Sequence, residues 1–240
     1  MLVGIAALLG IAALPLGVGE WAGSVFARSA QVFSQGRSAQ AQITLPQVNV
    51  YALQLGVFDS AERAADEVRR LEGLGVRCMI WQKEKLRLIC DAALERSALN
   101  LDTACGQEAY VIEETLNRVA LRIEADAAGI EADKALLALP DDALARLLGG
   151  EPLAEEIARV RAAAEAARDA HPEHVLYTDL AENLIAWCDM MEAPGMEHAR
   201  GYGTAAMFAL CRELRQALIA ASTASAQRTP STAADVMPPA

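Results

Sequence analysis

Aromatic residues and positive charge are both scarce in this chain of 240 residues. Aromatic side chains make up 5% of the sequence, although 53% of it is hydrophobic, so we expect a core built from small aliphatic side chains. The net charge is −11, with 32 acidic against 21 basic residues. Nucleic acids and anionic lipids are themselves negative, so this excess of carboxylates argues against either one as the main partner.

Motifs of catalytic and metal sites are also missing from the sequence. The five cysteines are scattered, and none has the spacing of a zinc knuckle or a redox pair. His171 and His174 flank Pro172, which interrupts a helix, and His198 lies far along the chain, so we expect no metal site. No glycine-rich nucleotide loop and no hydrolase triad order is present. The sequence therefore favours a non-catalytic protein without a cofactor.

Charged residues are absent from residues 1–19, and Glu20 is the first. A membrane-spanning helix needs about 20 apolar residues, and runs of about 17 can suffice. A signal peptide would begin with basic residues, and none precedes this run, so we predict a single transmembrane helix over 1–19 with Trp21 at the interface. Taken alone, Arg28 and Arg37 on the long side would favour a body inside the cell.

The segment 50–91 carries the clearest pattern in the chain. Tyr51–Phe58 alternates polar and apolar residues and predicts a strand with one buried face. Apolar positions at helical spacing predict a helix over 61–71, which a glycine ends. Alternation in Cys78–Trp81 and in Leu86–Cys90 predicts two further strands joined by a polar turn. The predicted order is strand, helix, hairpin.

These residues resemble the SPOR domain, the sporulation-related repeat that binds bacterial cell-wall glycan. The first-strand motif of the family, V-Q-x-G-x-F, is similar to Leu53–Phe58, and its helix ending L-x-x-x-G is similar to Leu71–Gly75. Its later motif, y-R-V-x-V-G-P-F, is matched in part by Leu86–Ala93. That segment keeps Arg87 and the alternation but lacks the aromatic residue, the glycine and the proline–phenylalanine pair.

The resemblance implies an α+β fold: an RNP-like βαββαβ antiparallel sheet over 48–125, with helices on one face and the other face open to glycan. Gln54 matches the glycan-contacting glutamine of the family, and its amide can both donate to and accept from sugar groups. Arg87 matches the family arginine, which can pair with a muramic carboxylate. Trp81 is no family position, but it would lie beside Arg87 and could stack on a sugar ring. An ordinary solvated sheet face is the alternative for all three.

The segments after the third strand have weaker patterns. We expect the second helix of the family within 91–107 and its fourth strand over Tyr110–Glu113. Arg118–Glu124 alternates and favours a fifth strand, whereas the apolar spacing from Leu116 also fits a helix.

Two cysteines in this region leave an alternative open. If Trp81 lies opposite Arg87, then Cys78 lies opposite Cys90. Opposed strand residues are close enough for a disulfide in some geometries. The other possibility is that both are buried thiols, as free cysteines commonly are.

Beyond residue 126 the composition shifts to helix formers. Apolar stripes predict a small helical bundle, with one helix that stops near Pro140, a short one from Asp141, and a later one opened by a capping box at Asp179. The sequence thus divides into a transmembrane anchor (1–19), a flexible linker (20–47), a SPOR-like domain (48–125), a helical bundle (126–222) and a disordered tail (223–240).

The resemblance implies a membrane-anchored, non-catalytic protein that binds peptidoglycan, as denuded glycan strands, at division or sporulation sites. Because that ligand lies outside the cell, it also implies a single-pass cell-membrane protein with an extracytoplasmic body. The alternative is a structural envelope adaptor that binds other proteins through the degenerate SPOR sheet and the helical bundle. Binding to purified wall sacculi separates the two functions.

Overall fold

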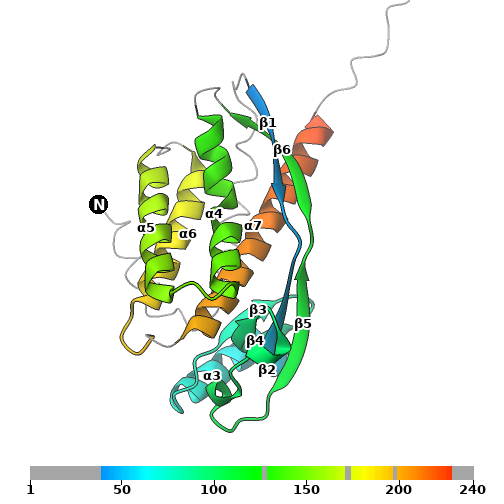
Figure 1. Cartoon of the computed structure of the whole chain (residues 1–240). Coiled ribbons are helices and arrows are strands. Elements are labelled where there is room, and N and C mark those ends of the chain that lie inside the picture. Colours follow the sequence, from blue (N-terminus) through cyan, green and yellow to red (C-terminus); the bar gives the residue numbers. More distant parts are fainter. Residues whose placement is uncertain (1–38, 126–128, 171–173, 197–198, 229–240) are drawn as a thin grey trace, which may run out of the picture.

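The computed structural model of the protein describes residues 39–125, 129–170, 174–196 and 199–228, and its fold is α+β (Figure 1). The predicted anchor, 1–19, lies outside these residues. Within the described ranges, no helix has the length and apolar character needed to cross a bilayer. The last helix continues to Arg228, so it includes the start of the segment predicted to be a disordered tail.

Four antiparallel strands form the main sheet, in the order β3-β4-β2-β5. Helix α3 (Ala61–Glu72) joins β2 to β3, and the Ser60 side chain caps it by accepting a hydrogen bond from the backbone N–H of Arg63. The strand–helix–hairpin order predicted from the sequence is therefore present. The strands are β2 (Val48–Phe58), β3 (Met79–Gln82), β4 (Leu86–Ala93) and β5 (Tyr110–Leu116).

Helix α3 covers one face of this sheet. Its buried positions, Val68 and Leu71 among them, recur at the spacing of three and four that predicted the helix. They pack against Leu53, Leu88 and Cys90 of the sheet. Burial of a valine or leucine side chain contributes roughly 1.5–3 kcal/mol, so this small cluster is a large part of what holds α3 in place.

A two-stranded ribbon continues the sheet at one end (Figure 1). Strand β1 (Ala39–Leu45) pairs antiparallel with β6 (Val119–Ala125). Beyond Pro46, the chain of β1 continues as β2 and pairs with β5, which itself leads into β6. Proline has no backbone N–H and cannot donate to a ladder, so its position fits the boundary between the two sheets.

The ribbon changes two expectations. The prediction that all of 20–47 is a flexible linker is wrong for 39–45, where Ile43 and Leu45 are buried against the helices. Polar glutamines and alanine obscured the alternation in that segment. For Arg118–Glu124, the structure selects the strand over the helix that the sequence also allowed.

No α-helix lies between β4 and β5, where the second helix was expected within 91–107. Two short 3-10 turns, η2 (Arg96–Ala98) and η3 (Leu101–Ala104), take its place. Asn100 stands between them in extended backbone, and its side chain accepts a hydrogen bond from the Asp102 N–H at 3.1 Å. Short polar side chains that bond to nearby backbone compete with helix formation, which explains why the alanine-rich segment does not continue as a helix.

In the described part of the chain, four α-helices follow the ribbon. Helices α4, α5 and α6 lie side by side, and α7 runs between them and the sheet (Figure 1). The capping pattern at Asp179 lies inside a helix instead of opening one. The helices are α4 (Ile130–Leu148), α5 (Leu153–Ala170), α6 (Val175–Met191) and α7 (Arg200–Arg228).

Helix α4 is continuous through Pro140, although the sequence predicted a break there and a separate short helix from Asp141. A proline in a helix interior removes one hydrogen bond and crowds the preceding turn, which costs about 3 kcal/mol. Leu137 and Leu144 on either side of it are fully buried. Their burial, at roughly 1.5–3 kcal/mol each, is large enough to offset that cost.

One hydrophobic core joins the sheet to the helices. Val50, Ala52 and Ile89 of the sheet belong to the same buried cluster as Phe208 and Leu214 of α7. The sequence-based boundary between the SPOR-like domain and the bundle therefore does not separate two cores. Helix α7 covers the sheet face that points away from α3, so the prediction that helices cover only one face is wrong.

Arg215 of α7 ties three parts of the fold together. Its guanidinium donates to the backbone carbonyl oxygen of Pro46 at 2.8 Å and to that of Asn117, and it pairs with the carboxylate of Asp141 on α4. The two side chains of this ion pair are only 4% and 3% exposed. The two carbonyls lie where the main sheet passes into the ribbon, so the arginine supplies donors at the break in the ladder.

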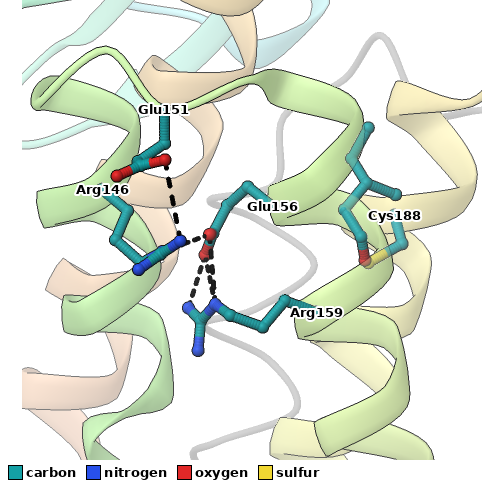
Figure 2. A network of polar contacts seen from close by, with 6 residues as sticks. Arg146, Glu151, Glu156, Arg159 and Cys188 are labelled. Carbon is teal, nitrogen blue, oxygen red and sulfur yellow. Dashed lines mark hydrogen bonds and ion pairs between the residues drawn. The ribbon is translucent and has the colours of Figure 1, made fainter.

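A second buried carboxylate links α4 to α5 (Figure 2). The side chain of Glu156 is fully buried between Arg146 and Arg159. The Nε of Arg146 donates to it at 2.8 Å, and the Nε of Arg159 donates to both of its oxygens at 3.1 Å. Beside this network, the Cys188 thiol donates to a backbone carbonyl of α5, and burial raises the pKa of that thiol to about 12. The partners all belong to packed helices, so we assign the network a structural role.

Candidate functional site

Gln54 and Arg87, the two positions matched to the SPOR family, lie in contact. The Arg87 Nη1 donates to the Gln54 Oε1 at 2.7 Å. Two register shifts in the β2–β4 pairing flank Gln54, which lies opposite Ile89. Because Ile89 belongs to the core under α7, Gln54 faces that helix and is only 7% exposed. Arg87 is half-buried, so this pair is not the open polar face that the resemblance implied.

Trp81, the third predicted site residue, is a core residue. It is 1% exposed, its ring stacks on Phe208 with centroids 4.8 Å apart, and its Nε1 donates to the carbonyl oxygen of Ala205 at 3.2 Å. The prediction that it lies exposed beside Arg87 is therefore wrong on exposure, although the two do lie opposite each other in the β3–β4 ladder. Alternation along β3 placed Trp81 on the correct face but gave no sign of a helix covering it.

Small side chains allow α7 to approach the sheet this closely. Gly201, Ala205 and Ala209 recur at every fourth position of the helix and so share one face. A Cβ at Gly201 would lie 1.5 Å from an oxygen of Asp91 on β4, so no larger residue fits there without displacing that carboxylate. The contact between α7 and the sheet is thus built into the sequence of α7.

The sheet is curved around α7. Lys83 follows β3 and pairs at 3.0 Å with Glu114 of β5, although β3 and β5 are the two opposite edges of the sheet. Arg212 of α7 lies between these edges, with its guanidinium 5.6 Å from the Trp81 ring centroid, and burial lowers its pKa. The predicted glycan face is therefore closed by both apolar and charged groups.

A cavity of about 620 Å³ lies beside the first turn of α7. Its lining residues come from loops and element ends of both the sheet and the helices, so they do not belong to a single sequence motif. Its apolar wall includes Leu147 of α4 and Leu94 after β4. Its polar lining includes Arg77, Asp91, Asn100, Thr103, Arg200 and Thr204.

Asp91 of β4 belongs to both the sheet and the cavity lining. It is 3% exposed, and its Oδ2 accepts a hydrogen bond from the backbone N–H of Asn100 at 2.6 Å. Its Oδ1 is the atom that approaches Gly201. Burial raises the pKa of Asp91, although backbone hydrogen bonds from Asn100 and Ala92 oppose the rise. The carboxylate thus connects the turn region after β4 with the start of α7.

Sequence reasoning missed the residues of this cavity. Asp91 stands where the SPOR motif has its glycine, and a carboxylate within an apolar strand was a signal that could have been read. Arg77 and Arg200 carry no such signal, because each is a single arginine outside any motif. Only the packing of α7 against β4 brings their segments together.

We expect Asp91→Asn to become more stable relative to the wild-type protein as the pH rises. The carboxyl has a higher pKa in the folded than in the unfolded chain, so its protonated form favours folding. The wild type loses that contribution as the pH rises from about 3.9 through the raised pKa, and asparagine has no proton to lose. Urea unfolding of both proteins at several pH values measures the difference. A difference independent of pH would contradict a desolvated carboxylate.

The five cysteines are free, and four of them are buried. Cys78 and Cys90 follow the register that would place them opposite each other, yet they form no disulfide. Burial raises the pKa of Cys78 to about 12 and that of Cys90 to about 11. Thiols with such pKa values are poor nucleophiles at neutral pH, so we assign them to the core beneath α3.

Metal-binding side chains do not gather in the part of the chain that the structure describes. His174 stacks on Tyr177 with ring centroids 4.0 Å apart. His171 and His198 lie outside the described residues.

Known proteins offer no guide to this site. No family model, no curated protein and no solved structure matches the chain. Its function is therefore inferred from the chemistry of its own residues.

Proposed function

We propose that this protein is a non-catalytic, membrane-anchored envelope adaptor that binds other proteins, and that its SPOR-like sheet holds α7 on the face where the SPOR family holds glycan. The observation that carries the proposal is the stacking of Trp81 on Phe208 under α7, with both rings buried. A sugar ring has no access to an indole in that position. The surface that we assign to a partner is the cavity beside the first turn of α7.

The strand order supports a SPOR-like, RNP-like origin of the sheet. In a split βαβ arrangement the first and third strands lie in the centre, and the fourth and second strands flank them. Here β2 and β4 are central, and β5 and β3 flank them. Helix α3 connects the first strand to the second, as that arrangement requires. The second helix is the missing part, replaced by η2 and η3.

Glycan binding is the second candidate, and one contact favours it. Gln54 and Arg87 meet at 2.7 Å, so the two family positions form a joined polar group at the edge of α7, and Arg87 is partly exposed. Its guanidinium could pair with a muramic carboxylate from outside the sheet. Trp81 would take no part in such a site.

The two candidates differ in a sedimentation experiment. We expect the full-length protein in detergent to stay in solution when denuded glycan strands are pelleted, and Arg87→Ala to behave identically. If glycan were the ligand, the wild type would pellet with it, and loss of one charge-assisted hydrogen bond in Arg87→Ala would weaken binding about 10- to 150-fold. That second result would replace the adaptor proposal with the glycan one.

Cross-linking in cells provides the complementary measurement. A photoreactive phenylalanine derivative in place of Leu101, which is 64% exposed near the cavity, should give discrete protein adducts. The same derivative in place of Asp66, exposed on α3, is the matched control and should give none. A reporter fused after Ala240 should show that the body is extracytoplasmic. Adducts at neither position, or a cytosolic reporter, would count against an envelope adaptor.

A further inference from the structure

We propose that the cavity beside the first turn of α7 binds the C-terminal carboxylate of a partner peptide whose last side chain is apolar. Arg77 and Arg200 would pair with the carboxylate, and Leu94 would contact the side chain. The inference rests on the proposed adaptor function and specifies the group that the partner presents. Capture of the C-terminal carboxylate is a recurring mode of peptide recognition.

Two arginines line the cavity among the charged residues that the structure describes there. Among the described residues, no carboxylate lies within ion-pair distance of Arg77 or Arg200. Asp91 is engaged by the Asn100 N–H and packs against Gly201. An arginine side chain presents a planar fork of donors that matches a carboxylate, so two of them in one cavity favour that group.

The remaining carboxylates argue for a ligand with one negative charge. Glu95 also lines the cavity, and its Oε2 accepts a hydrogen bond from the Ser97 hydroxyl at 3.3 Å. Asp91 occupies the space beside Gly201 in the first turn of α7, where an anion would otherwise benefit from the helix dipole. Repulsion from these two groups weighs more heavily against a phosphate dianion than against a carboxylate.

The apolar surface of the cavity would contact the apolar last side chain of the peptide. Leu147 lies in the wall and is 2% exposed, whereas Leu94 is 53% exposed. Two further leucines with exposed side chains, Leu74 and Leu101, adjoin lining residues in the sequence. An exposed leucine on the cavity lining, with further exposed leucines in the adjoining segments, is typical of an interaction site. A volume of about 620 Å³ falls within the range of pockets that hold a small ligand.

The test compares two peptides that differ in one group. The full-length protein in detergent is titrated into a fluorescein-labelled hexapeptide of sequence GSGSAL, as the free acid and as the C-terminal amide, and anisotropy is measured. We expect the acid to bind about 10- to 150-fold more tightly, because the amide forfeits charge-assisted hydrogen bonds. Arg77→Met and Arg200→Met should each weaken binding of the acid peptide by a similar factor. Neither should change the affinity for the amide peptide.

Two further variants control for folding and for general charge. Arg96→Met removes an exposed arginine of η2 that does not line the cavity, and it should bind the acid as the wild type does. Ala98→Trp fills the exposed rim without altering charge and should abolish binding of both peptides. Thermal melts that match the wild type establish that each variant is folded.

The outcomes separate this inference from the proposed function. Equal binding of acid and amide, no binding of either, or full binding by Arg77→Met and Arg200→Met would overturn the carboxylate site. Inorganic phosphate that binds more tightly than the acid peptide would assign the cavity to phosphate instead. If the site fails but cross-links at Leu101 persist, the adaptor function stands with a different contact. Sedimentation with denuded glycan would reveal failure of the adaptor function itself.

Discussion

Trp81→Ala should lower the free energy of unfolding by about 3–5 kcal/mol, the usual cost of removing a fully buried large aromatic side chain. The change removes the stacking on Phe208 at 4.8 Å and leaves the carbonyl oxygen of Ala205 without its indole donor. It also leaves a cavity between α7 and the sheet. Urea unfolding of the full-length protein, followed by circular dichroism, measures the loss.

The matched control is Tyr110→Ala, because Tyr110 is an aromatic residue on the edge strand β5 that is 54% exposed. We expect it to shift the unfolding midpoint very little, since surface substitutions usually change stability by less than about 0.5 kcal/mol. If Trp81→Ala behaved like Tyr110→Ala, the indole would have to lie in solvent. The face would then be open as the SPOR resemblance implied, and glycan would again be the leading ligand.

Arg215→Met should be similarly destabilising, by about 3–5 kcal/mol, because breaking a buried ion pair leaves one charge without its partner. The substitution leaves the buried Asp141 carboxylate without its ion-pair partner. It also removes the donors to the backbone carbonyl oxygens of Pro46 and Asn117. Burial already raises the pKa of Asp141 and the charge of Arg215 opposes it, so loss of the arginine will raise that pKa further. The difference in free energy of unfolding between the wild type and Arg215→Met should therefore become smaller as the pH falls and Asp141 becomes protonated.

Two comparisons make this result specific. The double variant Arg215→Met with Asp141→Leu should recover part of the loss, because replacing both members of a buried pair by apolar groups is often neutral. Arg69→Met, which breaks an exposed pair with Asp66 on α3, should have little effect. If Arg215→Met were as mild as Arg69→Met, the contact between α7 and the ribbon would not depend on this ion pair.

Strands β2 to β4 and helix α3 were predictable because their signals are local. Alternation in β2, β3 and β4 and the apolar stripe of α3 lie within short windows. The pairing of Trp81 with Arg87, one possible register from the sequence alone, is the one observed. Strand β1 was missed because it begins with alternating alanines and glutamines, a composition that linkers share. The continuity of α4 through Pro140 was missed because tertiary burial overrides a local breaker.

The site could not be predicted for a different reason. Period-two alternation shows which residues of a strand share a face, but it does not show what covers that face. Phe208, which covers Trp81, lies more than a hundred residues further along the chain. Arg77 and Arg200 converge only after that packing has formed. A resemblance confined to the sheet residues therefore implied an open face that the rest of the chain closes.

The position of α7 also has a consequence for how the chain folds. The last strand of the main sheet ends at Leu116. The residues of α7 that cover one face of this sheet, such as Phe208 and Leu214, follow about a hundred residues later in the sequence. Contacts this distant in sequence form slowly, because a long loop must close before they contribute. During synthesis, a nascent chain that stops before α7 would present Trp81 and Ile89 to water. We therefore expect a prematurely terminated product to be degraded or held by chaperones, and not to persist as a shorter, functional SPOR-like domain.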